Sequence, residues 1–147
     1  MAVYLGNNQV DILGGIEITN LYHFPNGTQW TQSNIVSESI YTVYNANGIW
    51  VAGSGASRKG LYYSTDGKTW TQSNITSGTF NCVYYANGIW VAGSGNNKGL
   101  YYSTDGKTWT QSNITSSIFN CVYNANGIWV TGADNDGLYY SVTWELA

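Results

Sequence analysis

Few side chains in this 147-residue sequence could act as acids, bases or nucleophiles. The only histidine is His23, and the only thiols are Cys82 and Cys121. Glycoside hydrolysis needs two carboxyl groups about 5–9.5 Å apart, but the acidic residues are scattered: Asp11, Glu17, Glu38, Asp66, Asp105, Asp134, Asp136 and Glu145. His23 stands where equivalent segments carry Tyr63 and Tyr102, which favours a structural aromatic position over a general base. We therefore expect no catalytic residue and no enzyme activity.

Ligands for a metal ion or a phosphate group are equally sparse. Asp134-Asn135-Asp136-Gly137 offers oxygen donors, but calcium loops of the EF-hand type need more ligands at fixed spacing, so a polar turn is favoured. Gly53-Ser54-Gly55 and Gly93-Ser94-Gly95 precede neither a helix start nor a Gly-Lys-Ser/Thr sequence, so they do not match phosphate-binding loops. We expect no metal and no cofactor.

The composition excludes several classes of partner. Only 9% of the residues are charged and the net charge is −3, whereas nucleic acids and anionic membrane surfaces require clustered lysine and arginine. No run of about 18 apolar residues predicts a membrane span, and the N-terminus does not resemble a secretory signal. Cys82 and Cys121 recur at the same position of a repeat, which predicts two small buried side chains rather than a disulfide.

The chain is built from a repeat. Residues Gly60–Asn74, GLYYSTDGKTWTQSN, return unchanged at Gly99–Asn113. A looser copy covers Asn20–Asn34, and a shortened one covers Gly137–Trp144. The triplet Gly-Ile-Trp recurs at intervals of 40 and then 39 residues. Periods of this size are typical of propeller blades, solenoid turns or repeat arrays.

Each repeat carries four strand signals. In one of them these are Phe80–Tyr85, Ile89–Ala92, Leu100–Ser103 and Thr108–Ser112, separated by an Asn-Gly pair, a glycine-rich loop and an Asp-Gly pair. Four antiparallel strands in about 40 residues are typical of a β-propeller blade. The sequence therefore predicts an all-β propeller of four blades in a single domain, with blades at approximately 1–36, 37–76, 77–115 and 116–147.

Two points of this architecture have alternatives. Shifting the second repeat back by 40 residues aligns Val43-Tyr44 with Val3-Tyr4 and Trp70 with Trp30, so that residues 1–36 are interpreted as a full but degenerate blade. Alternatively, Ile18–Asn34 supply two strands and residues 1–17 form a leader. A closed four-bladed monomer is the first prediction for the whole molecule, and a partial ring completed by a second copy is the alternative.

Differences between the repeats locate the candidate binding face. The loop between the second and third strands shortens from GSGASRKG to GSGNNKG to GADNDG. In an up-and-down blade this loop shares one end with the crossover to the next blade, and the Asn-Gly and Asp-Gly turns lie at the other end. Binding residues are usually found on variable loops of a rigid scaffold. The predicted ligand-binding residues are Ser57, Arg58, Lys59, Asn96, Asn97, Lys98, Asp134, Asn135 and Asp136.

Ser64–Trp70 and Ser103–Trp109, both STDGKTW, resemble the Asp-box turn of BNR-type β-propeller repeats in a form shortened by one residue. The resemblance implies a hairpin whose aspartate accepts hydrogen bonds from turn amides and whose tryptophan packs between strands. It implies no activity: sialidases that carry this turn bind the substrate carboxylate with three arginines, and Arg58 is the only arginine in this sequence. In the last repeat the turn is cut to Ser141–Trp144. The opening MAVYLGNNQVDILGG resembles the leader of some phage or prophage tail proteins, which implies a virion tail or an extracellular location.

A non-catalytic recognition module is the function that these features favour. Sugar-binding propellers present aromatic rings together with Asn, Gln and Thr side chains, and this sequence is rich in both. We therefore expect a lectin-like, carbohydrate-binding module, in phage-tail or cell-surface host recognition. The alternatives are a structural or protein–protein interaction propeller and, least favoured, a glycoside hydrolase. The expected partner is a glycan or a protein on the variable-loop face, with homo-oligomerisation open.

Overall fold

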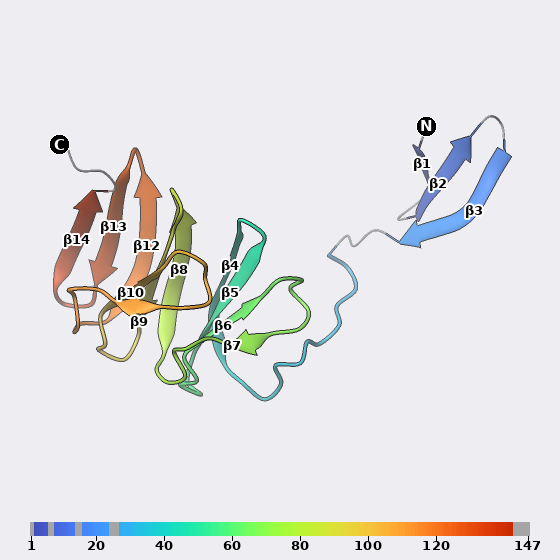
Figure 1. Ribbon diagram of the computed structural model, residues 1–147. Helices are drawn as coiled ribbons and strands as arrows, with labels where there is room; N and C mark the ends of the chain where they lie inside the picture. The colour runs from blue at the N-terminus through green and yellow to red at the C-terminus, as the bar shows by residue number, and fades with distance from the viewer. Residues whose placement is uncertain (1, 6–7, 14–15, 24–26, 143–147) are drawn as a thin grey trace. The chain divides into compact units, whose positions relative to one another are not determined.

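The computed structural model describes the chain except for residues 1, 6–7, 14–15, 24–26 and 143–147 (Figure 1). The chain divides into two compact units, Met1–Gln32 and Ser33–Ala147. Every regular element of the described residues is a β-strand, which confirms the all-β class. No helix that could cross a membrane is found among these residues.

The first unit contains an antiparallel sheet of β1 (Ala2–Leu5), β2 (Asn8–Leu13) and β3 (Ile16–His23), in that order. Residues 27–39 contain no strand, so the fourth strand expected at Trp30 is not formed. The prediction of a four-stranded blade in residues 1–36 is therefore wrong, and the proposed leader also contains strands. The described part of β1 has four residues, and Leu5 pairs with Asn8, whereas the corresponding strands of the later repeats have seven residues.

The second unit contains three antiparallel sheets, each with its strands in sequence order. The first consists of β4 (Ile40–Ala46), β5 (Ile49–Ser54), β6 (Leu61–Ser64) and β7 (Thr71–Gln72). The second consists of β8 (Phe80–Ala86), β9 (Ile89–Ser94), β10 (Leu100–Ser103) and β11 (Thr110–Gln111). The third consists of β12 (Phe119–Ala125), β13 (Ile128–Ala133) and β14 (Gly137–Val142). We call them repeat sheets 1, 2 and 3.

The hairpin between the first two strands of every repeat sheet turns at an Asn-Gly pair. Asn87 and Gly88 have φ values of 51° and 82°, and the pairs at 47–48 and 126–127 have similar positive values. Two consecutive residues with positive φ are what a type I′ turn requires. The predicted type I′ hairpin is thereby confirmed.

The turns between the third and fourth strands are organised by Asp66 and Asp105. Asp105 Oδ1 accepts hydrogen bonds from the backbone N–H groups of Lys107 (2.8 Å) and Thr108 (2.9 Å). The Ser103 hydroxyl also donates to Asp105, at 3.0 Å. Asp66 forms the same three bonds in repeat sheet 1. The predicted role of these aspartates as acceptors for turn amides is confirmed.

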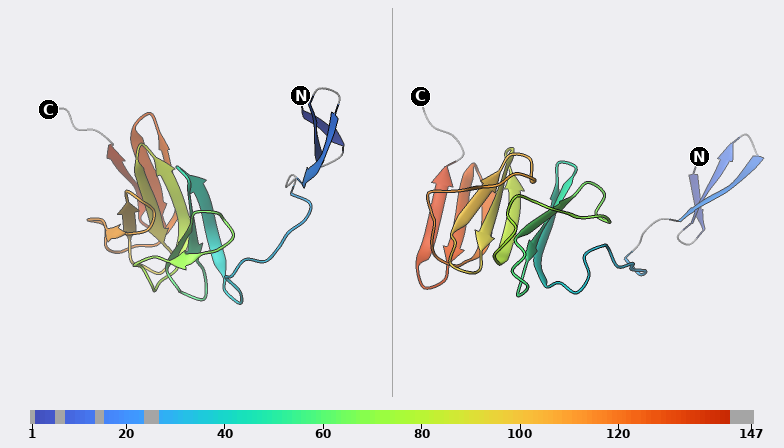
Figure 2. Two further views of the ribbon diagram at one scale, coloured as in Figure 1. Left: turned by 45° about the vertical axis from the view of Figure 1, so that its right-hand side comes forward. Right: turned by 60° about the horizontal axis from the view of Figure 1, so that its bottom comes forward.

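The three repeat sheets pack face to face in chain order, with their first strands β4, β8 and β12 side by side (Figure 2). A hydrophobic core lies between repeat sheets 1 and 2. Its buried members, none more than 6% exposed, are Val51, Leu61, Phe80, Val83, Trp90, Ala92 and Trp109. Each sheet thus provides the apolar surface that its neighbour needs, as expected for a repeat that cannot bury its faces alone.

The described sheets do not form the predicted ring of four complete blades. The second unit has three sheets, none of them closed on itself, and the last has three strands. The reason lies in the shortened last repeat: β14 runs straight through Ser141 and Val142, where the earlier repeats begin the turn that the aspartate organises. Thr143 and Trp144, the rest of the predicted last turn, lie outside the described residues.

The two cysteines differ in burial. Cys82 is buried and Cys121 is exposed, so the prediction of two equivalent buried positions is wrong for Cys121. Cys82 Sγ lies 3.9 Å from the Phe119 carbonyl oxygen, under the next sheet. Cys121 has no such cover because repeat sheet 3 is the last of the described stack. Both are free thiols, and burial raises the pKa of Cys82 to about 12.

Candidate functional site

The variable loops join β5 to β6, β9 to β10 and β13 to β14, and we call them loops 1, 2 and 3. Loops 1 and 2 are fixed at equivalent points of the crossover that follows each sheet. The Gly60 N–H donates to the Gly78 carbonyl (2.9 Å), and the Gly99 N–H donates to the Ser117 carbonyl (3.3 Å). A Cβ on Gly60 would collide with the carbonyl oxygen of Ile75, so glycine is required there. These contacts confirm that loops and crossovers share one end of the sheets.

Each loop holds one residue other than glycine in the left-handed backbone region. These are Arg58 (φ 56°), Asn97 (φ 67°) and Asn135 (φ 58°), each two residues before the glycine that ends the loop. All three are exposed. Asparagine tolerates this conformation better than other side chains. Arg58 therefore adopts a costlier backbone conformation than its two counterparts.

Four of the nine predicted ligand residues use their side chains to shape the loops. The bonds are Ser57 Oγ with Ser54 Oγ (2.9 Å), Ser94 Oγ to Asn96 Oδ1 (2.9 Å), the Ser117 N–H to Asn97 Oδ1 (2.6 Å) and Ser117 Oγ to Asp136 Oδ2 (2.9 Å). The Tyr139 hydroxyl also donates to Asp136, and these bonds from Tyr139 and then Ser117 lower the pKa of that carboxyl. These four side chains therefore already have hydrogen-bond partners within the protein.

The other five predicted residues are Arg58, Lys59, Lys98, Asp134 and Asn135. Their side chains make no hydrogen bond or ion pair within the described part of the chain, and all except the half-buried Lys98 are exposed. Loops 1 and 2 present cations, whereas loop 3 presents a carboxylate and an amide. These groups remain available to a ligand.

Shared crossovers bring the three loops into one row. Gly78 bonds loop 1, and the N–H of the next residue, Thr79, donates to Asn96 of loop 2 (3.3 Å). Ser117 bonds Asn97 of loop 2 and Asp136 of loop 3. The structure therefore places residues from three distant sequence segments along one edge of the stack.

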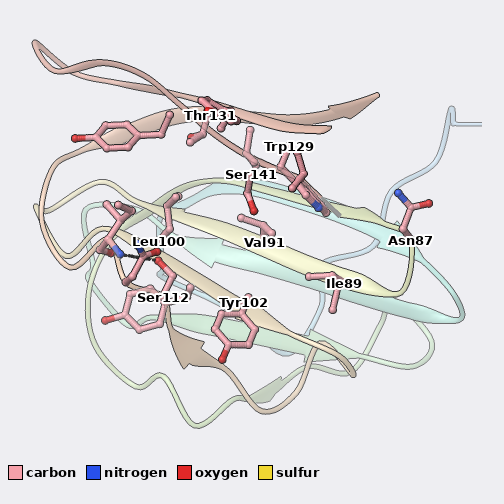
Figure 3. A pocket seen from close by; sticks show the side chains of 16 residues that line it. Asn87, Ile89, Val91, Leu100, Tyr102, Ser112, Trp129, Thr131 and Ser141 are labelled. Carbon is pink, nitrogen blue, oxygen red and sulfur yellow. Dashed lines mark hydrogen bonds between the residues drawn. The ribbon is translucent and has the colours of Figure 1, made fainter. Parts of the chain in front are cut away.

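A pocket of about 510 Å³ lies between repeat sheets 2 and 3 (Figure 3). Its lining combines apolar side chains with aromatic rings and neutral polar groups. They are Asn87, Ile89, Val91, Leu100, Tyr101, Tyr102, Ser112, Asn113, Ile114, Val122, Trp129, Thr131, Tyr139, Tyr140, Ser141 and Val142. No charged side chain lines the pocket, and no cluster of metal ligands is found among the described residues.

The corresponding space between repeat sheets 1 and 2 is filled. There the turn at Gly106 lies against Ile49 and Val51, so closely that a Cβ on Gly106 would stand 3.1 and 3.2 Å from their methyl carbons. Trp109 follows this turn and is 3% exposed. No described residue of repeat sheet 3 plays this part over the equivalent Ile89 and Val91. The pocket occupies the space that the fourth strand fills between repeat sheets 1 and 2, and no described residue of repeat sheet 3 forms such a strand.

Buried serines that organise the loops and turns are functional residues that the sequence alone did not identify. Ser54 Oγ accepts the Lys59 N–H (2.8 Å), and Ser94 Oγ accepts the Lys98 N–H (3.1 Å). Both serines are 0% exposed. The signal in the sequence is the repeated Gly-Ser-Gly, whose central serine accepts hydrogen bonds from the loop backbone. The sequence alone also did not identify the pocket, although the shortened last repeat marked its position.

The sequence matches no protein-family model, and it matches no curated protein. Among solved structures, the chain is similar to the computationally designed Ika8 protein, with 14% identity and a TM-score of 0.60, over 97% of this chain and 45% of that one. It is also similar to the computationally designed Ika4 protein, with 13% identity and a TM-score of 0.57, over 96% of this chain and 88% of that one. The chain thus spans less than half of the Ika8 chain. At this identity the likeness concerns the fold alone.

Proposed function

We propose that this chain is a non-catalytic recognition module of β-propeller architecture, which binds a carbohydrate along the row formed by loops 1, 2 and 3. Each four-stranded repeat sheet corresponds to one blade, with strands in sequence order and the first strands of neighbouring blades side by side. The Asp-organised turns between third and fourth strands support this assignment.

The observation that carries the proposal is the contrast between the bases and the tips of the loops. The bases repeat the same backbone bonds, at Gly60 and at Gly99. The tips differ in sequence and expose Arg58, Asn97 and Asn135 at equivalent positions. A rigid scaffold with variable exposed tips is the usual arrangement of a binding surface.

A carbohydrate is the ligand class that suits the chemistry of this row. Amide, carboxylate and cationic groups that are free of internal partners can hydrogen-bond sugar hydroxyls, and polar side chains of this kind fix ligand orientation in binding sites. Three tips at successive repeats also suit a ligand that is itself a chain of similar units. Recognition of surface glycans, as on a phage tail or a cell surface, is the role we infer.

The proposal is tested on a glycan array with the protein displayed multivalently. The loop variant Arg58→Asn/Lys59→Ala/Asp134→Ala removes groups without internal partners and keeps a residue that tolerates positive φ at position 58. We expect it to weaken sugar binding by roughly tenfold or more, since each lost hydrogen bond to a charged group is worth about 1.5–3 kcal/mol.

The control variant is Thr65→Ala/Lys68→Ala/Thr104→Ala, at exposed positions of the turns on the opposite end of the sheets. We expect it to bind like the unmodified chain. Equal loss in both variants would contradict the loop row as the site. No sugar hit at any valency would reject the carbohydrate and favour a protein ligand.

A further inference from the structure

We propose that a second copy of this chain completes the stack of repeat sheets. Repeat sheet 3 of one copy packs against repeat sheet 1 of the other, through the same face-to-face contact that joins repeat sheets 1 and 2 within the chain. The fourth strand of repeat sheet 3 comes from residues 27–32 of that second copy.

The outer face of repeat sheet 3 is apolar, and no described strand covers it. Ile128 and Val130 are each 41% exposed, and Leu138 is 77% exposed. The residues at these positions in repeat sheet 1 are Ile49, Val51 and Leu61, and the last two are 0% exposed because repeat sheet 2 covers them. The open face of repeat sheet 3 therefore has the side chains that a following sheet normally buries.

The outer face of repeat sheet 1 is the matching surface. Ile40, Val43 and Trp50 are 39%, 54% and 37% exposed. Their equivalents in repeat sheet 2 are Phe80, Val83 and Trp90, which are 0%, 6% and 1% exposed against repeat sheet 1. Thus one end of the stack exposes the Ile/Val/Leu face of the internal contact, and the other end exposes the face that packs against it.

These two faces identify the occupant as another copy. The internal contact already shows that Val51 and Leu61 of this face are fully buried, with Ile49 half-buried, against a Phe/Val/Trp face. The two exposed faces differ from the two buried faces mainly at Ile40, which stands where repeat sheet 2 has Phe80. Burial of exposed apolar surface is favourable at roughly 25 cal/mol per Å², so a head-to-tail contact between copies is driven by the same force as the core.

Just before repeat sheet 1, Asn34 makes the two hydrogen bonds that Asn74 makes just after a fourth strand. Asn34 Oδ1 accepts the Trp70 N–H (2.7 Å), and Asn34 Nδ2 donates to the Trp70 carbonyl (3.0 Å). Asn74 forms the same two bonds with Trp109, at 2.7 and 2.9 Å. Asn74 stands just after β7, the fourth strand of repeat sheet 1. By equivalence, the residues before Asn34 correspond in the repeat to a fourth strand.

Those residues have the sequence for it. Thr28–Gln32 reads TQWTQ where the complete repeats read KTWTQ. The Trp30 indole N–H donates to the Gly27 carbonyl (3.0 Å), as the Trp109 indole does to the Gly106 carbonyl (3.1 Å). Yet Trp30 is 87% exposed and Trp109 is 3% exposed. We place this segment of the second copy along the edge of β14 that no described strand covers in the first copy, with its Trp30 in the pocket over Ile89 and Val91.

Two copies are the number that closes the ring. A head-to-tail contact forms a ring when the rotation closes and an open filament when it does not. β-Propellers typically have four to eight blades, and two copies with three repeat sheets each supply six. The ring size rests on the propeller fold proposed above, whereas the contact between copies rests on the two open faces alone.

A disulfide tests the contact directly. Cys82 lies against Phe119 of the next sheet, and the equivalent pair across the proposed contact is Cys121 of one copy and Ile40 of the other. In the variant Ile40→Cys, mild oxidation is expected to give a covalent species of twice the 16.1 kDa chain mass. Adding Cys121→Ser should abolish it.

The matched control is Val36→Cys. Val36 is as exposed as Val43, but its equivalents Thr76 and Thr115 stay exposed in the complete repeats, so it lies outside the contact. We expect no specific cross-link there. A ladder of higher species from Ile40→Cys would overturn the closed two-copy ring, and the absence of any Cys121-dependent cross-link would overturn the contact.

Light scattering provides the second measurement. The unmodified chain should have twice the chain mass, Val43→Glu should have the mass of one chain, and Val36→Glu should keep the double mass. A single-chain mass at every concentration for the unmodified protein would overturn the proposal. Neither variant alters the loop row, so failure of the contact is distinguishable from failure of sugar recognition.

Discussion

Arg58 occupies a backbone conformation that the other two loops give to asparagine. A left-handed conformation costs an ordinary L-residue roughly 1–2 kcal/mol, and asparagine less. Strained positions of this kind gather at functional sites. The guanidinium of Arg58 has no internal partner among the described residues that would offset the strain, which agrees with a role in recognition.

We expect Arg58→Asn to raise the free energy of unfolding by about 0.5–1 kcal/mol, because it relieves this strain. Urea denaturation of the variant and the unmodified chain measures the difference. The control Lys59→Asn changes the adjacent exposed cation, which has no positive φ, and should stay within about 0.5 kcal/mol. A destabilised Arg58→Asn would show that the arginine makes a contact worth more than the strain.

The turn aspartates make stability depend on acid pH. Hydrogen bonds from the Thr69 and Lys68 N–H groups and then from the Ser64 hydroxyl lower the pKa of Asp66 to about 2, below the usual value of about 3.9. Because the folded pKa is the lower one, Asp66 stabilises the fold above about pH 4, and this contribution is lost as pH falls towards about 2. Asp105 shifts in the same direction.

In Asp66→Asn the loss of stability between about pH 4 and about pH 2 should be smaller than in the unmodified chain, because one group of lowered pKa is gone. Urea midpoints at several pH values across this window measure it. Thr65→Ala, an exposed change in the same turn that removes no titratable group, should leave the profile unchanged. Parallel profiles for Asp66→Asn and the unmodified chain would contradict the assignment.

At the scale of elements, the Asp-organised turn does two things. It reverses the chain between the third and fourth strands, and it carries Gly106 and Trp109 onto Ile49 and Val51 of the preceding sheet. Where this element is complete the space between sheets is filled, and where the last repeat shortens it a pocket of about 510 Å³ opens. The presence of this turn thus determines whether the space between two neighbouring sheets is filled.

We expect Trp109→Ala to destabilise the chain by about 3–5 kcal/mol, the usual cost of removing a buried tryptophan. Thermal or urea unfolding measures the loss. Thr108→Ala is the matched control: the threonine is adjacent and exposed, and only its backbone N–H is bonded, so we expect a change within about 0.5 kcal/mol. A loss below about 1 kcal/mol for Trp109→Ala would mean that the turn does not fill the core.

At the scale of the molecule, the stack ends in two apolar faces that each have a buried counterpart inside the chain. A folded state that binds another copy is stabilised by mass action, so its melting temperature depends on protein concentration. We expect the melting temperature of the unmodified chain to rise with concentration and that of Val43→Glu to stay constant. Scanning calorimetry over a hundredfold concentration range measures this, with Val36→Glu retaining the rise. A constant melting temperature for the unmodified chain would count against the association.

The sequence by itself determined the repeat and the local structure within it. Asn-Gly at 87–88 specifies its own turn because both residues accept positive φ, and Asp105 organises its turn through neighbours within three positions. These interactions are local, so letters and spacing suffice to predict them. The all-β class and the strands of the complete repeats followed in the same way, as did the end of the sheets on which the loops lie.

Only the tertiary structure decided what covers each sheet. Cys82 and Cys121 have the same neighbours in sequence, yet one is buried and the other exposed, because burial depends on a sheet that lies tens of residues away or is absent. For the same reason the sequence could not show that the side chains of Asn97 and Asp136 hydrogen-bond Ser117, whereas the Arg58 side chain has no partner among the described residues. The extent of the stack, and hence its open faces, depends on packing between repeats, which the sequence of one repeat does not determine.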